Sequence, residues 1–107
     1  MIVKSPLRPT RLVPSGFGWV DHRLLRDGHL RACSTHALAL YLLLVLAADG
    51  QGISFYGDRL VKNLLGLSTE QLADARACLV RTGLIAYEAP LYQLLEIPSS
   101  PEGGASC

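Results

Sequence analysis

The sequence predicts a mainly α-helical fold with a small β-hairpin, and three observations support this prediction. Half of the 107 residues are hydrophobic and 18% are charged, a balance typical of one compact domain. Residues 35–48 and 69–82 have the length and the apolar content of core helices. Two further apolar runs, residues 84–87 and 91–97, flank a short turn sequence, which favours a hairpin.

The composition divides the chain into three parts. Residues 1–16 hold three prolines and scattered arginines, so we expect an extended basic arm. Residues 17–97 carry the apolar periodicity and form the folded domain. Residues 98–107, PSSPEGGASC, contain no apolar anchor and are expected to form a flexible tail.

The charges are unevenly distributed. Residues 1–31 hold six cations and two acids, a net charge of +4, whereas residues 32–107 hold four cations and seven acids, a net charge of −3. A basic leading segment on an acidic body indicates either an arm that binds nucleic acid or a solubilising tail.

A short helix is expected first, over residues 22–26. Asp21 is its candidate N-cap, and Gly28 ends it. Three leucines are expected to point inward: Leu24, Leu25 and Leu30.

The first long helix begins at Ser34 or Thr35 and ends before Asp49. Residues 37–48 are uninterruptedly apolar, but a membrane-spanning helix needs about 20 such residues, so we expect a core helix and no membrane segment. A helix that is apolar on every face is either wrapped by other elements or pressed against a partner. Of these two arrangements, we favour contact with a partner, in a homodimer that packs through residues 37–48.

A short strand is expected over residues 53–55, followed by a helix from Tyr56 to Leu65. The apolar positions of this helix follow helical spacing: Leu60, Val61, Leu64 and Leu65. Arg59 and Lys62 face outward.

Ser68 and Gln71 have the spacing of a capping box, which begins the helix over residues 69–82. The residues that this helix should bury are Leu72, Ala75, Cys78 and Leu79. In the hairpin that follows, Tyr87 and Tyr92 can pair across the strands, with core packing as their expected role.

The run GISFYGDRLVKNLLGLSTEQLADARACLVRTGLIAYEAPLYQLLEI resembles a winged helix-turn-helix domain. The resembling parts are a short strand, a helix ending LLGLS, a capped helix, and TGLI at the start of a hairpin. The preceding segment is similar to the leading helices of replication-type modules. The resemblance covers about residues 19–97, so residues 17–97 are expected to be the winged-helix domain.

Proteins with similar modules are bacterial transcription regulators, replication-initiator and replisome-organiser proteins, and accessory proteins of mobile elements. The resemblance therefore implies a DNA-binding protein of transcription regulation, replication or transposition. It implies that the helix over residues 69–82 enters the major groove of double-stranded DNA. The residues it assigns to bases are Thr69, Gln71 and Asp74, and those it assigns to phosphates are Arg8, Arg11, Arg59, Lys62 and Arg76.

Glu70 and Asp74 depart from the usual pattern, since DNA attracts cations and these acids would face its negative potential. Acids in the first turns of a helix also have an ordinary role, because they complement the helix dipole. The alternative is a winged-helix protein–protein interaction module without direct DNA binding. Such a module would dock through the helix over residues 69–82, which carries acidic residues, or through the apolar residues 37–48.

Three possible metal ligands occur close together at His29, Cys33 and His36, but the predicted cap at Ser34 interrupts any continuous helix through them. We therefore expect no metal site and no cofactor, with His22 and His29 as surface residues or local caps. No nucleophile elbow or phosphate-binding glycine loop occurs, so we do not predict an enzyme. The start of the chain lacks the apolar region of a signal peptide, and no two cysteines are closely spaced, so we expect a cytoplasmic protein.

Overall fold

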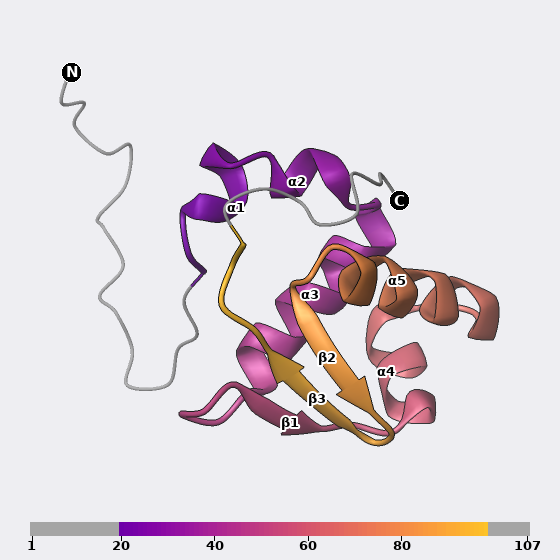
Figure 1. The fold of residues 1–107 in the computed structure, drawn as a ribbon. Helices are drawn as coiled ribbons and strands as arrows, with labels where there is room; N and C mark the ends of the chain where they lie inside the picture. Colours follow the sequence, from indigo (N-terminus) through magenta and orange to yellow (C-terminus); the bar gives the residue numbers. More distant parts are fainter. Residues whose placement is uncertain (1–19, 99–107) are drawn as a thin grey trace, which may run out of the picture.

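A computed structural model describes residues 20–98 (Figure 1). The elements are, in order, α1 (Arg23–Arg26), α2 (His29–Ala32), α3 (Thr35–Ala47), β1 (Ile53–Phe55), α4 (Asp58–Leu65), α5 (Thr69–Arg81), β2 (Ile85–Glu88) and β3 (Leu91–Leu94). The prediction of a mainly helical fold with a small hairpin is confirmed. The predicted arm with Arg8 and Arg11, and the predicted tail beyond Pro98, lie outside the described residues.

The three strands form one antiparallel sheet in the order β1-β3-β2. The hairpin β2–β3 is therefore extended by β1, which pairs with β3 so that Ser54 lies opposite Tyr92. On the other side of β3, Tyr87 lies opposite Tyr92, as the sequence predicts. Figure 1 shows the sheet in front of α3, with α4 and α5 to one side.

The core lies between α3, α5 and the inner face of the sheet. Leu40 and Leu44 of α3 meet Leu72 and Leu79 of α5 there, and each is at most 1% exposed. Tyr92 closes the core from the sheet side and is also 1% exposed. Because these side chains come from three separate elements, the helices and the sheet are stabilised together.

Two serines begin the long helices, as the sequence predicts. Ser34 Oγ accepts a hydrogen bond from the amide of Ala37 at 3.1 Å. Ser68 Oγ accepts from the amide of Gln71, while Gln71 Oε1 accepts from the amide of Ser68. This reciprocal pair confirms the predicted capping box and fixes the residue at which α5 begins.

Several predicted boundaries are wrong by one to three residues. Helix α4 begins at Asp58 rather than Tyr56, because Gly57 is the extended N-cap residue. Strand β3 ends at Leu94, because Leu95 leaves the sheet ladder and donates its amide to the carbonyl of Leu84.

The prediction for the leading leucines was largely wrong. Leu24 is buried, but Leu25 is 71% exposed and Leu30 is 39% exposed. The backbone turns at Gly28, which has a φ of +84° and is the N-cap residue of α2. This second short helix was not predicted from the sequence. In α2 the residue that turns inward is His29.

No helix in the described part of the chain is both long enough and apolar enough to cross a membrane.

Candidate nucleic-acid interface

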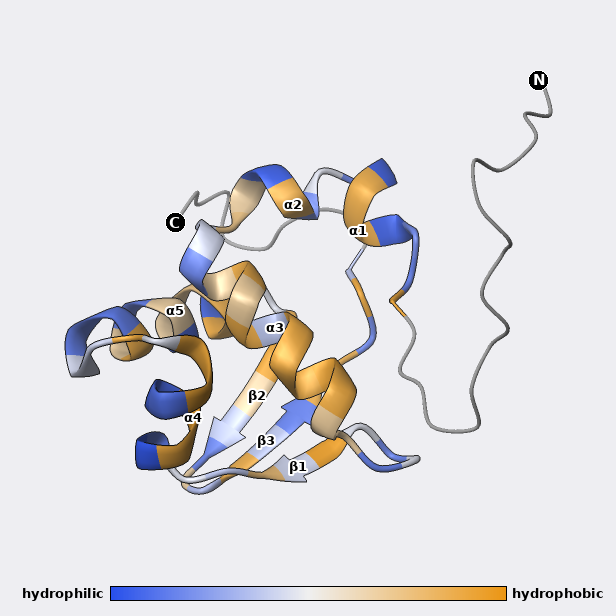
Figure 2. Cartoon of the chain, turned by 180° about the vertical axis from the view of Figure 1, so that it is seen from behind, coloured by the Kyte–Doolittle hydropathy of each residue, from blue (hydrophilic) through white to orange (hydrophobic). Residues whose placement is uncertain are grey.

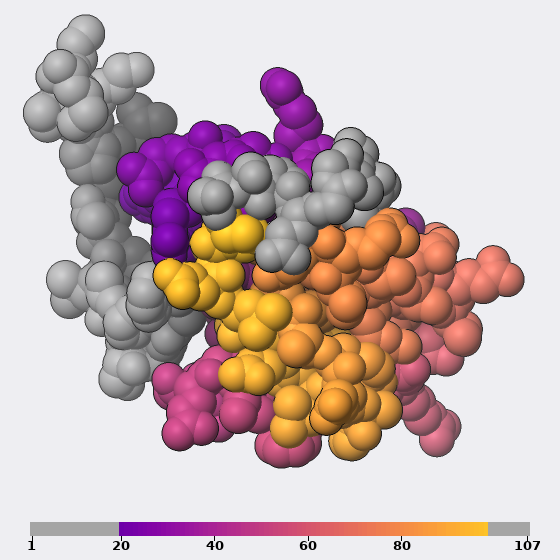
Figure 3. Space-filling model, viewed as in Figure 1, coloured from indigo at the N-terminus to yellow at the C-terminus, as the bar shows by residue number. Residues whose placement is uncertain are grey.

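Helix α5 presents one face to the core and the opposite face to solvent. Leu72, Ala75 and Leu79 are buried against α3 and the sheet. The residues exposed on the outer side of its first turns are Thr69, Glu70, Gln71, Ala73, Asp74 and Ala77. Figure 3 shows atoms of α5 at the right edge of the molecule.

The turn between α4 and α5 brings two predicted site residues together. Lys62 Nζ donates a hydrogen bond to Thr69 Oγ1 at 2.9 Å, across the turn at Gly66. Gly66 has a φ of +68°, a left-handed conformation that glycine adopts readily at the end of a helix. Lys62 therefore lies beside the first turn of α5.

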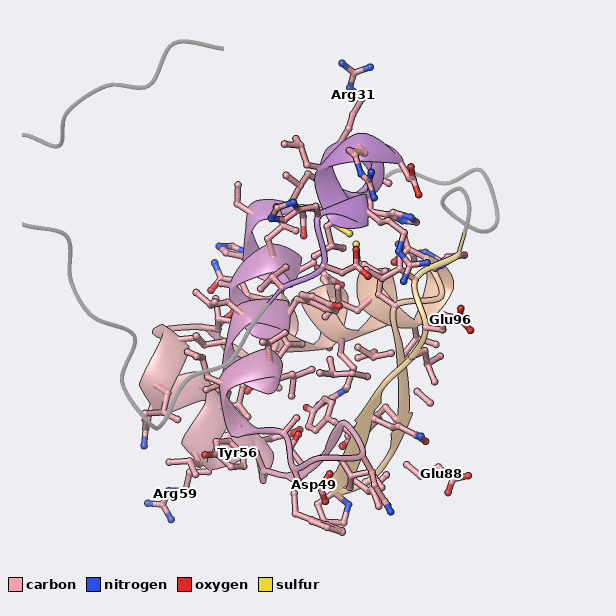
Figure 4. All side chains as sticks on the ribbon, turned by 90° about the vertical axis from the view of Figure 1, so that its left-hand side faces the viewer. Arg31, Asp49, Tyr56, Arg59, Glu88 and Glu96 are labelled. Carbon is pink, nitrogen blue, oxygen red and sulfur yellow. The ribbon has the colours of Figure 1, made fainter. Side chains whose placement is uncertain are left out.

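Arg59 lies on the exposed side of α4. Figure 4 shows its side chain pointing away from the body of the domain. With Lys62, it provides two cations on the helix that precedes α5.

Arg76 lies elsewhere, on the side of α5 that faces α4 and the sheet. Its Nη1 donates to Asp58 Oδ1 at 2.8 Å and to the Tyr92 hydroxyl at 2.9 Å. Its guanidinium also stacks 4.3 Å from the ring centroid of Tyr87, and its side chain is only 18% exposed. This geometry gives Arg76 a structural position, with its donors directed into the domain.

The electrostatic surroundings of Arg76 agree with this position. Burial on its own would lower its pKa, but the hydrogen bonds to Asp58 and Tyr92 outweigh burial, so the pKa is raised. The guanidinium therefore stays charged within a partly buried network.

A shallow groove of about 330 Å³ runs between the start of α3 and α5. Its lining residues are Ser34, His36, Gln71, Asp74, Ala75, Ala77 and Arg81. Two base-contact candidates, Gln71 and Asp74, thus share a surface with His36. His36 was not predicted to lie on this surface. It is the second residue of α3, and its side chain is exposed there.

The turn of the hairpin carries no cation. Glu88 is exposed and precedes the cis peptide bond between Ala89 and Pro90. Figure 4 shows Glu88 projecting from the sheet side of the molecule, far from Arg59.

The described residues hold seven cations and eight acids, a net charge of −1. The outer face of α5 contributes Glu70 and Asp74 to this balance. A polyanion approaching α5 would therefore meet cations mainly at its edges, at Arg59 and Lys62 on one side and Arg81 on the other.

The histidine and cysteine cluster of the sequence is not assembled. Within residues 20–98, no group of three histidine, cysteine or acidic side chains could hold a metal ion. The expectation that His29 is a surface residue or a local cap is wrong, because it is fully buried. Its Nε2 donates to the carbonyl of Pro98 at 2.8 Å, and its buried Nδ1 has no partner. Cys33 is also buried, and this burial raises the pKa of its thiol.

Comparisons of this chain with protein-family models, with curated proteins and with solved structures found no match.

Proposed function

We propose that this chain is a winged helix-turn-helix protein that binds double-stranded DNA. Helix α5 would enter the major groove, with Thr69, Gln71 and Asp74 at base edges and Arg59 and Lys62 at phosphates. The observation that carries the proposal is the uncovered outer face of a capped helix, held beside a cation-bearing helix by the Lys62–Thr69 hydrogen bond.

The order of elements supports this proposal. The resemblance implies a helix, a strand, two helices joined by a tight turn, and then a hairpin. The elements from α3 to β3 follow this order. The hairpin strand β2 contacts α5, and an arrangement of this kind supports the proposal of a wing beside that helix. Fold alone does not determine function, so the argument depends on the exposed residues of α5.

The chemistry of these residues suggests selective rather than general binding. Carboxylates such as Asp74 can accept a hydrogen bond from the amino group of cytosine, and Gln71 can pair with adenine. Neither attracts the phosphate backbone, which binds cations by releasing counterions. Affinity would therefore depend on Arg59, Lys62 and the predicted basic arm, with Arg8 and Arg11.

Fluorescence anisotropy with a labelled random-sequence duplex tests DNA binding. We expect binding at about 50 mM salt that weakens steeply as the salt concentration rises. Replacing Arg59 and Lys62 together by alanine should lower the slope of log K against log salt by about two units. Arg26→Ala, an exposed cation on α1, is the matched control and should leave the slope unchanged. An absence of binding at 50 mM salt would count against the proposal.

The biological role that we propose is transcription regulation, or replication or transposition of a mobile element, as the resemblance implies. Selection of bound duplexes from a random pool would identify a preferred sequence. A preference that disappears in Gln71→Ala and Asp74→Ala would support base contact by α5.

A protein–protein interaction module is the second candidate, and one observation favours it. Leu42 and Leu46 of α3 are 53% and 62% exposed, although large apolar side chains usually avoid water. If the anisotropy experiment shows no DNA binding while this surface binds protein, the second candidate replaces the first.

A further inference from the structure

A cavity of about 480 Å³ lies between the start of α1, the second half of α3 and the segment that follows β3. Figure 1 shows this segment running from the end of β3 towards α1. The apolar lining of the cavity comes from Tyr41 and Val45 of α3 and from Leu94 and Ile97. Figure 2 shows that the last turns of α3 are apolar throughout. The volume is within the range of cavities that hold a small ligand, so one large side chain would fit.

The apolar lining includes one polar group that is available to an occupant. Tyr41 is 7% exposed, and its hydroxyl has no hydrogen-bond partner among the described residues. The hydroxyl is nevertheless not sealed from solvent, since the one fully buried and unpaired side-chain atom within residues 20–98 is Nδ1 of His29. A group that enters the cavity can therefore form a hydrogen bond with Tyr41.

The described part of the chain begins beside this cavity. Val20 is its first residue, and the next residue, Asp21, lines the cavity. Consecutive Cα atoms are about 3.8 Å apart, so the Cα of Trp19 lies within about 7.6 Å of the Cα of Asp21. Trp19 is the one tryptophan in the sequence. The largest side chain of the protein is therefore attached next to an apolar cavity.

We propose that the cavity holds the side chain of Trp19 from the same chain. The indole ring would pack against Val45 and Leu94, and its N–H group would donate a hydrogen bond to the Tyr41 hydroxyl. A buried tryptophan usually has such a partner, and burial can remove about 150–250 Å² of its surface from water. This contact would fix the point at which the predicted basic arm leaves the domain.

Charge favours this occupant. The charged residues of the lining are Asp21, Asp49, Glu96 and Arg23, with a net charge of −2. Residues 1–19 hold three cations and no acid, a net charge of +3. Opposite charges favour approach of this segment to the cavity and disfavour an anionic ligand. A short covalent connection also gives Trp19 a high effective concentration at the cavity, which a free partner lacks.

The intrinsic fluorescence of the full chain tests the proposal, because Trp19 is its one tryptophan. We expect emission at a shorter wavelength than in the urea-unfolded chain, and a quenching constant for acrylamide that is severalfold lower. Val45→Glu would place a carboxylate against the ring. It should shift the emission towards that of the unfolded chain and raise the quenching constant severalfold.

Circular dichroism checks that Val45→Glu folds. If it does not, Ala48→Leu is the second variant, because Ala48 also lines the cavity and a leucine there narrows it without adding charge. Ala48→Leu should likewise raise the quenching constant.

Leu42→Glu is the matched control, because it adds the same carboxylate to α3 at an exposed position that does not line the cavity. It should leave the emission and the quenching constant unchanged. Emission equal to that of the unfolded chain overturns the proposal, as do equal effects of Leu42→Glu and Val45→Glu.

The protein concentration separates docking within one chain from contact with another copy. The quenching constant should be the same at low and high concentrations. Shielding of Trp19 that grows with concentration would assign the contact to a second copy and overturn the proposal. The measurement contains no DNA, so its outcome does not depend on the proposed function.

Discussion

Arg76 and Asp58 form an ion pair, 2.8 Å between Nη1 and Oδ1, that joins the middle of α5 to the first turn of α4. The same nitrogen also donates to the hydroxyl of Tyr92 in β3. One guanidinium on α5 therefore connects this helix to α4 and to the sheet. The Arg76 contacts therefore link elements that the proposed DNA contact uses.

Arg76→Ala should lower the free energy of unfolding by about 1–3 kcal/mol, because it leaves the Tyr92 hydroxyl without its partner and removes the stacking on Tyr87. The ion pair contributes the smaller part, since Asp58 is half exposed. Urea denaturation followed by circular dichroism measures the change. Arg59→Ala, an exposed cation on α4, is the control and should change stability by less than about 0.5 kcal/mol.

A loss of DNA binding by Arg76→Ala without any loss of stability would contradict this prediction. It would support the contact between Arg76 and DNA phosphate that was expected from the sequence.

Gly52→Ala should destabilise the turn that precedes β1. Gly52 has a φ of +79°, and a Cβ there would lie 3.2 Å from the carbonyl oxygen of Leu94. We expect a loss of about 1–3 kcal/mol in the free energy of unfolding, since both the backbone conformation and the close approach disfavour a side chain. Gly50→Ala is the control, because it has open space and no positive φ. Equal stability of the two variants would contradict this prediction.

His29→Ala should destabilise the fold by about 2–4 kcal/mol, because it opens a cavity and leaves the carbonyl of Pro98 without its donor. His29→Gln keeps a donor and should lose less. His22→Ala removes an exposed histidine from the start of α1 and should have little effect on the melting temperature. A melting temperature for His29→Ala close to that of the unsubstituted chain would show that the buried hydrogen bond contributes little.

Asp21 should titrate at an unusually low pH. Its side-chain hydrogen bonds from Arg23 lower its pKa from 3.8 to about 2. Since the folded pKa is the lower one, this pair stabilises the fold above about pH 4, and the contribution is lost as the pH falls towards 2. An NMR titration of the Asp21 carboxyl carbon measures the pKa. Arg23→Gln should return it towards 3.8, and an unchanged midpoint would exclude the Arg23 side chain as the cause.

The long elements could be predicted from the sequence because their signals are local. Ser34 and Ser68 mark the starts of α3 and α5 by side chains that bond to amides three residues later. The pairing of Tyr87 with Tyr92, with ring centroids 4.6 Å apart, follows from a short turn and alternating strands. Such signals need only a few residues of chain.

The errors have two sources, an element too short to show a period and a contact between distant parts of the chain. Helix α2 has four residues, too few to show a period, and the direction of its side chains depends on the turn at Gly28. His29 is buried because its partner is Pro98, which is 69 residues away in sequence. No local pattern reports such a contact.

The candidate site was predictable in part. The exposed positions of α5 follow from helical spacing. The Lys62–Thr69 contact was not predicted, because it depends on how the turn between the two helices brings them together. The position of Arg76 was not predictable, because it lies at the border between the buried and exposed sides of α5. Which way it turns depends on Asp58 and Tyr92, both contributed by other elements.

The hydrogen bond between His29 and Pro98 also determines where the domain can be shortened. A chain trimmed at Leu94, where the last strand ends, would lose the acceptor for a fully buried imidazole together with Ile97, which is 7% exposed. The shortest fragment suitable for expression should therefore extend through Pro98, beyond the boundary that the strand alone would suggest.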